Sequence, residues 1–215
     1  MPPSSRPTPY ADLHLPTTVS DGQLPPERVA LAARRAGLRA VAMTDHDRFH
    51  PDQPPVTRRA GVTIIHGIEL RVDADQPVDL LGYGLSPTAE LAAEVDRLSE
   101  DRMDRGRRII DCVEDRLGVD LGLEARPGLG RPHIARAIAA HPGTDLDFQG
   151  AFDELIADGG PCYVARDVLS FDRGRELLSD ACALVVLAHP LRYDDPEAAL
   201  ALAPALDGIE LRYPY

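Results

Sequence analysis

Short apolar runs recur along the first part of the chain and again near its end, and each is followed by polar or turn-forming residues. Runs of this length, bounded by Gly, Pro, Asp and Ser, are typical of buried β-strands. They occupy residues 11–15, 38–43, 62–70, 78–83 and 184–188. Gly208-Ile209-Glu210-Leu211-Arg212 repeats the Gly-Ile-Glu-Leu-Arg of 67–71 and predicts a further strand, with Glu210 near its end.

Helical patterns separate several of these strands. Pro25-Pro26-Glu27 is a favourable helix start and Gly37 a favourable stop, which predicts a helix over 25–37 and a right-handed βαβ unit. Residues 171–182 and 196–203 predict two more helices around the last strands. The alternation indicates an α/β fold with a sheet covered by helices.

The pattern changes between residues 86 and 167, where helices follow one another without a strand. Ser86 is the predicted N-cap of a long helix with Pro87 in its first turn, and residues 131–140 and 148–157 predict further helices. We therefore expect a helical insertion at 86–167, within a barrel domain made of residues 1–85 and 168–215.

Composition excludes several classes of function. All 23 basic residues are Arg, so Schiff-base chemistry and a phosphate-binding P-loop lysine are excluded. The net charge of −12 argues against non-specific nucleic-acid binding as the main activity, and we do not expect sequence-specific nucleic-acid binding either. No apolar run reaches the ~18 residues of a membrane span, and Met1–Pro9 lacks the apolar core of a signal peptide. We expect a cytoplasmic protein that does not bind membranes, and the sequence leaves its oligomeric state open.

Three cysteines, Cys112, Cys162 and Cys182, form an odd number and show no Cys-x-x-Cys spacing. In a chain without an export signal this favours reduced, half-buried cysteines that serve as packing residues.

Metal-binding residue types gather where the predicted strands end or begin. His14, His46, Glu69, Asp79 and His189 all hold such positions, and Asp21 follows His14 in a turn-rich loop. Parallel strands would bring these side chains to one edge of the sheet. His, Asp and Glu are the ligands of Zn, Mn and Fe, so the pattern predicts a metal cluster. Asp45, next to His46, is expected to orient the loop or an imidazole.

These polar residues fall within longer segments of distinctive sequence. They are Asp-Leu-His-Leu-Pro-Thr-Thr-Val-Ser-Asp-Gly (12–22), Thr-Asp-His-Asp (44–47), Gly-Ile-Glu-Leu (67–70), Gly-Arg-Pro-His-Ile-Ala-Arg (130–136) and Ala-His-Pro-Leu-Arg-Tyr (188–193). In this order they resemble the motifs of the PHP (polymerase and histidinol phosphatase) family of metal-dependent phosphoesterases, in its stand-alone, small-substrate form.

The resemblance implies a distorted seven-stranded (β/α) barrel, incomplete at its C-terminus, that hydrolyses a small phosphate ester such as a nucleotide with metal-activated water. It implies up to three divalent ions of Mn, Zn or Fe, and we expect fewer. Glu69 would bridge two ions, His14 would bind the first, Asp79 and His189 the second, and Asp21 and His46 a third. The expected catalytic residues are Glu69, His46 and His189.

Three further residues are candidates for substrate binding. Arg192 could form a charge-assisted fork on a phosphate. Arg131 and His133, in the predicted insertion, could reach the substrate. For all three, surface ion pairing or helix capping is an equally weighted alternative.

The chain also departs from the family pattern. Pro16 stands where the first motif has a second His, Asp79 stands where related members carry a His, and the chain ends at Tyr215 before a Gly-Ser-Asp-x-His motif. Pro supplies no donor atom, whereas Asp is a suitable oxygen ligand. The alternative function is therefore a catalytically degenerate PHP domain that binds a phosphorylated ligand or a partner protein.

Overall fold

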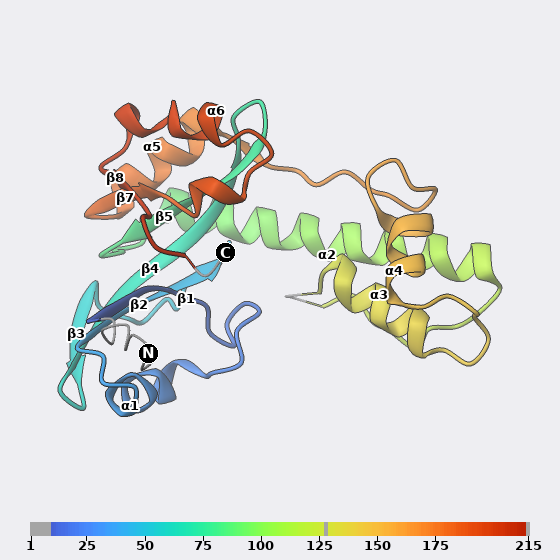
Figure 1. Cartoon of the computed structure of the whole chain (residues 1–215), viewed down its shortest axis with the longest axis horizontal. Helices are drawn as coiled ribbons and strands as arrows, with labels where there is room; N and C mark the ends of the chain where they lie inside the picture. Colours follow the sequence, from blue (N-terminus) through green and yellow to red (C-terminus); the bar gives the residue numbers. More distant parts are fainter. Residues whose placement is uncertain (1–9, 127–128, 214–215) are drawn as a thin grey trace, which may run out of the picture. The chain divides into compact units, whose positions relative to one another are not determined.

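The computed structural model describes residues 10–126 and 129–213. They divide into two compact units, one running up to Val95 and resuming at Val168, the other spanning Asp96–Asp167 (Figure 1). We call these the sheet unit and the helical unit. The division falls within helix α2 (Ala89–Leu117), so one long helix contributes residues to both units.

A mixed sheet forms the sheet unit. Most of its strands lie close to the predicted positions, but β3 (Val56–Arg59) and β6 (Leu169–Ser170) were not predicted. Among the described residues eight strands join it, six of them in the order β1-β2-β4-β5-β7-β8, while β3 and β6 pair with β4. Their bounds are Ala11–Leu15 (β1), Ala40–His46 (β2), Val56–Arg59 (β3), Val62–Asp73 (β4), Pro77–Tyr83 (β5), Leu169–Ser170 (β6), Leu184–Leu187 (β7) and Gly208–Ile209 (β8). The sheet curls into part of a barrel, which confirms the predicted α/β class (Figure 1).

Strand direction departs from the expectation of a parallel set. β1, β2 and β4 are parallel, but β5 runs antiparallel to both β4 and β7. The reason is the connection, because only Ala74, Asp75 and Gln76 separate β4 from β5. So short a link permits a hairpin, whereas a parallel crossover needs about a dozen residues or more.

The β3–β4 hairpin was missed by the sequence analysis. Ala60 and Gly61 both have positive φ, 50° and 81°, which suits a tight turn between antiparallel strands. β3 itself is mostly exposed, so it lacks the apolar alternation by which a strand is recognised.

Helices cover the sheet where the apolar pattern requires them. The predicted helix at 25–37 is α1 (Pro26–Arg35), which buries Val29, Ala30 and Ala33 in a cluster with residues of β2 and β4. α5 (Phe171–Ala181) begins at Ser170, whose hydroxyl accepts the Arg173 backbone N–H, and α6 (Pro196–Leu200) follows β7. A Cβ at Gly174 would lie 2.3 Å from Val72, so glycine lets α5 approach β4 closely.

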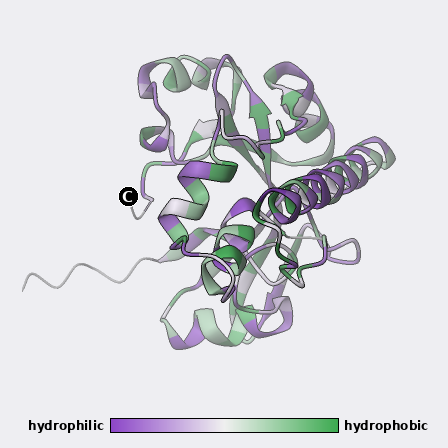
Figure 2. Cartoon of the chain, turned by 90° about the vertical axis from the view of Figure 1, so that its right-hand side faces the viewer, coloured by the Kyte–Doolittle hydropathy of each residue, from purple (hydrophilic) through white to green (hydrophobic). Residues whose placement is uncertain are grey.

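The helical unit contains the rest of α2, then α3 (Arg131–Ala140) and α4 (Phe148–Ala151), which continues as a π-helix over Phe152–Ile156. α2 carries both hydrophilic and hydrophobic residues along its length (Figure 2). Its N-cap is Thr88, whose hydroxyl accepts the Leu91 N–H, so the prediction of Ser86 as the cap is wrong. No helix in the described part of the chain is long and apolar enough to cross a bilayer.

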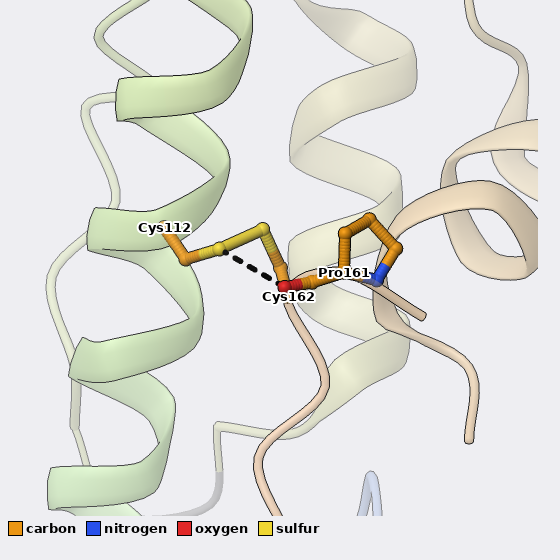
Figure 3. The surroundings of a disulfide bond; sticks show 3 residues. All are labelled: Cys112, Pro161 and Cys162. Carbon is orange, nitrogen blue, oxygen red and sulfur yellow. Dashed lines mark hydrogen bonds between the residues drawn. A yellow bond between two sulfur atoms is a disulfide. The ribbon is translucent and has the colours of Figure 1, made fainter. Parts of the chain in front are cut away.

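A disulfide joins Cys112 of α2 to Cys162, which follows the π-helix (Figure 3). The expectation of three reduced cysteines is therefore wrong for this pair, while Cys182 is free. The two residues are 50 positions apart, and their spacing carries no recognisable motif. The fold brings their Cα atoms to 5.6 Å, within the range that a disulfide requires.

Candidate metal centre

Three imidazoles converge on the carboxylate of Glu69. Its Oε2 lies 3.1 Å from His14 Nε2 and 2.9 Å from His46 Nδ1, and its Oε1 lies 3.1 Å from His189 Nε2. The Glu69 side chain is only 1% exposed. A single buried carboxylate therefore contacts three nitrogen donors that come from three different strands or strand ends.

The pairing of the strands brings these residues together. His46 is the last residue of β2 and lies directly opposite Glu69 in the parallel pairing with β4. His14 is the second-to-last residue of β1, which pairs with β2. Asp79 lies near the beginning of β5. Because β5 runs antiparallel to β4, Asp79 pairs with Arg71, near the carboxyl end of β4. A residue at the start of a strand thus reaches the same site as residues at the ends of the others.

His189 follows β7 and adopts an unusual backbone conformation. Its φ of 26° lies in the left-handed region, which a residue with a Cβ enters at an energetic cost. Its ring is buried, and among the described residues its Nδ1 has no hydrogen-bond partner. Strained backbone of this kind gathers at functional sites, where the surrounding structure enforces it.

Glu210 joins the cluster from the residue after β8. Its carboxylate oxygens both lie 3.2 Å from His14 Nδ1, and Oε2 accepts the His189 backbone N–H at 2.7 Å. Glu210 is absent from the predicted ligand set. The repeated Gly-Ile-Glu-Leu-Arg sequence was the available signal, because it places Glu69 and Glu210 in equivalent local contexts.

The cluster carries an excess of negative charge, which shows in the pKa values of its histidines. Burial alone would lower the pKa of His14, but hydrogen bonds to Glu210 and Glu69 outweigh it and raise the pKa to about 10. His46 behaves similarly, its pKa raised by Glu69 against burial. Burial would raise the pKa of Glu69, yet the imidazoles around it hold the pKa well below its usual range. The carboxylates thus favour positive charge here, which a metal cation can supply.

The donor atoms form two overlapping groups. One comprises His14, Glu69 and His189, the other His46, Glu69 and Asp79, and within each group the donor atoms lie within 4.8 Å of one another. Nitrogen and carboxylate donors in this combination suit Zn, Mn and Fe. The residues present therefore fit a divalent ion, and Glu69 is the member that both groups share.

Asp79 is also engaged by residues that the sequence analysis did not single out. Arg71 Nε and Nη2 donate to its two oxygens at 2.7 and 2.6 Å. The Asp79 backbone N–H donates to the Tyr193 hydroxyl at 2.8 Å, which in turn donates to the Ala188 carbonyl. The only sequence signal for Arg71 is its position two residues beyond Glu69, which places it on the same face of β4.

The loop after β1 is tied down by Asp45. Its carboxylate accepts the backbone N–H and hydroxyl of both Thr17 and Ser20, which confirms its predicted orienting role. A Cβ at Gly22 would lie 2.2 Å from the Pro16 carbonyl oxygen, so this tight loop requires glycine. Asp21 is exposed and belongs to neither donor group, although its charge contributes to the raised pKa of His46.

Arg192 lines a cavity of about 230 Å³ beside the cluster, and its Nη1 donates to the Tyr213 hydroxyl at 2.9 Å. The residues around this cavity are Arg71, Gln76, Pro77, His189, Arg192, Tyr193 and Asp194. Guanidinium groups beside candidate metal ligands suit an anionic substrate.

Arg131 and His133 have contacts of their own within the helical unit. Arg131 pairs with Asp158 at 3.0 Å and lies over the ring of Phe152, while His133 Nδ1 accepts the Gly130 N–H at the start of α3. These contacts match the ion-pairing and capping alternatives. A role for the two residues in substrate binding stays a prediction.

No protein-family model matches the chain. Among curated proteins it is 28% identical to a 3′,5′-nucleoside bisphosphate phosphatase of Chromobacterium violaceum, covering 85% of this chain and 67% of that protein. It is 27% identical to a phosphoribosyl 1,2-cyclic phosphate 1,2-diphosphodiesterase of Eggerthella lenta, covering 94% and 82%. It is also 27% identical to the 5′-3′ exoribonuclease Rnm of Escherichia coli, covering 85% and 66%.

These relatives are phosphoesterases, and they support the interpretation of the chain as a PHP-type phosphoesterase. Solved structures agree on the fold of the chain. An amidohydrolase from Chromobacterium violaceum with bound sulfate and no metal matches 94% of it, with a TM-score of 0.72 and 24% identity over 76% of that chain. A protein from Bifidobacterium adolescentis classed as a metal-dependent phosphoesterase gives a TM-score of 0.69, with 23% identity over 93% of this chain and 76% of that one.

Proposed function

We propose that this chain hydrolyses small phosphate esters, nucleotides among them, by means of divalent metal ions. The observation that carries the proposal is Glu69, a buried carboxylate shared by two groups of metal donors. A buried carboxylate among imidazole donors suits a divalent ion, and a bound divalent ion promotes hydrolysis of phosphate esters.

His14, Glu69 and His189 would hold an ion in one group, and His46, Glu69 and Asp79 are the donors of the other. A divalent ion supplies two things to ester hydrolysis, acidification of a water molecule and neutralisation of the phosphate oxygens. Asp21 stays a predicted ligand, and its charge influences His46. Glu210 holds His14 and the His189 backbone in place.

The remaining polar groups would bind and orient the substrate. Arg192 would donate to phosphate oxygens from the wall of the cavity beside His189. His46 has a 34% exposed side chain, against 9% for His14 and 5% for His189, so it is the imidazole best placed to exchange a proton with a bound ester. Asp45 would keep the adjoining loop closed around the site.

The relatives support a phosphorylated nucleoside or ribose as substrate, because their names refer to a nucleoside bisphosphate, a cyclic ribose phosphate and RNA. The net charge of −12 disfavours a long polyanion and leaves neutralisation to metals and local arginines. A small phosphorylated molecule is therefore the preferred substrate.

The test is an assay on chelator-stripped protein that has been resupplied with Mn²⁺, Zn²⁺ or Fe²⁺. We expect phosphate release from adenosine 3′,5′-bisphosphate and from a generic aryl phosphate, with no release before metal is restored. His189→Ala should abolish the reaction, whereas the control His141→Ala, in the helical unit, should retain it. Equal rates before and after metal removal would contradict the proposal.

The second candidate is a PHP domain that binds a phosphorylated ligand or partner without turnover. Pro16 favours it, because the first motif then lacks one imidazole donor. The two candidates differ in one measurement. If calorimetry detects binding of adenosine 3′,5′-bisphosphate to the metal-loaded protein while none of the three metals supports phosphate release, the binding function holds and the hydrolase does not.

A further inference from the structure

Arg71 and Asp79 form an ion pair that the sheet itself imposes. They lie directly opposite each other on the antiparallel strands β4 and β5, so their side chains share one face. The guanidinium meets the carboxylate as a fork, Nε to Oδ1 at 2.7 Å and Nη2 to Oδ2 at 2.6 Å. Both oxygens of Asp79 therefore already accept a charge-assisted hydrogen bond.

Burial makes this pairing consequential for metal binding. The Asp79 side chain is 1% exposed, so its charge depends on a close partner. Its Oδ2 is also 3.5 Å from His189 Nε2, and its backbone is held through the Tyr193 hydroxyl. A dication that bound these same oxygens would sit against the guanidinium and would be repelled by it.

The local charge points the same way. Glu69, Asp79 and Glu210 contribute three negative charges to the cluster, and Arg71 contributes one positive charge. Arg71 therefore neutralises part of this negative charge without a metal ion, which weakens the attraction for a second dication.

We propose that the Arg71 guanidinium takes the place of a metal ion at the donor group of His46, Glu69 and Asp79. The centre then holds one divalent ion, bound by His14, Glu69 and His189. This inference rests on the proposed function, since it assigns the cations of the same site. It also gives a reason for Asp79 where related PHP proteins carry a His, because a carboxylate, unlike an imidazole, accepts the arginine fork.

The experiment is a metal count that needs no turnover. Stripped protein is dialysed against Mn²⁺, and bound metal per chain is measured by mass spectrometry together with the Mn²⁺ electron paramagnetic resonance spectrum. We expect one ion in the wild type and two in Arg71→Met, where the second ion also gives the spectrum of coupled Mn²⁺. Arg71→Lys keeps the cation and should hold one ion, as should the control Arg28→Met on the exposed face of α1.

Asp79→Asn covers the case in which Arg71→Met fails to fold by circular dichroism. Because Asp79 contacts the ligand His189 but is not itself a ligand of the retained ion, this variant should still bind one Mn²⁺, with an affinity lowered by no more than about 10–100-fold. Two ions in the wild type, one ion in folded Arg71→Met, or loss of the ion in Asp79→Asn would each overturn the proposal. Two ions in an active wild type would leave the proposed hydrolase intact, whereas an enzyme that works without any ion would overturn the hydrolase mechanism.

Discussion

The sheet unit and the helical unit differ most in what they bury. Among the described residues, the buried polar and charged side chains all belong to the sheet unit: Thr17, Thr44, Asp45, Asp47, His66, Glu69, Asp79 and His189. The buried cluster of the helical unit consists of Ile, Leu, Val, Ala and Cys162. Burying polar groups is costly unless each finds a partner, so they gather where chemistry requires them.

The comparison separates two ways of using a core. The helical unit combines apolar packing with a cross-link, and stability is the property that both features serve. The sheet unit accepts the strained His189 backbone and a cluster of like-charged carboxylates in return for a metal centre. Changes in the two units should therefore alter different measurable properties.

The largest expected effect is a loss of stability in the helical unit, with the metal centre unchanged. Replacing Cys112 and Cys162 by Ser should lower the free energy of unfolding by about 4 kcal/mol, the chain-entropy value for a loop of 50 residues. Denaturant unfolding with and without reductant measures the change. Metal affinity should stay within about twofold of the wild type. A large loss of affinity would show that metal binding in the sheet unit depends on the disulfide of the helical unit.

Glu69→Gln should have the opposite consequence, a loss of metal binding. Removing the charge that both donor groups share should weaken metal binding by about 100-fold or more, which corresponds to about 2.7 kcal/mol. Isothermal titration with Mn²⁺ measures the change, and hydrolysis should fall with metal content. The matched control Glu154→Gln, exposed in the helical unit, should leave both unchanged. Unaltered metal binding in Glu69→Gln would mean that this carboxylate is not a ligand.

A smaller effect tests the loop that closes on the site. Thr17 is fully buried, and its hydroxyl donates to Asp45 at 2.9 Å. Thr17→Val keeps the shape but removes this donor, so unfolding should become easier by about 1 kcal/mol. Thermal denaturation of the metal-free protein measures it, with Thr57→Val on β3 as the control. Greater stability in Thr17→Val would show that the remaining donors satisfy Asp45.

The smallest effect concerns the surface of the helical unit. Arg107 pairs with Asp104 at 2.7 Å, but both side chains are more than half exposed, at 61% and 68%. Arg107→Gln should therefore change the free energy of unfolding by less than about 0.5 kcal/mol. Urea denaturation can detect a larger change, which would indicate that this pair belongs to a wider charge network.

Sequence patterns located the strands well because apolar runs are local features. His14, His46, Glu69 and His189 were predicted together for the same reason, since each marks the end of such a run. The direction of β5 depended on the length of a turn and not on hydrophobicity, so the parallel expectation was wrong.

Several of the features that the sequence patterns did not predict depend on long-range contacts. The Cys112–Cys162 bond spans 50 positions, and Glu210 reaches His14 across 196. Arg71 and Asp79 are close in sequence, but their pairing follows from a register that only the hairpin fixes. The predicted roles of Asp21, Arg131, His133 and Arg192 stay predictions.

The contact between His14 and Glu210 also bears on how the chain folds. β1 and β8 stand at the two ends of the strand order, and these residues join them through side chains. Contacts between residues so distant in sequence form slowly, because the intervening chain must first be ordered. We therefore expect the donor group around His14 to form late in folding, so that a bound metal ion would indicate that the segment after β8 has already docked.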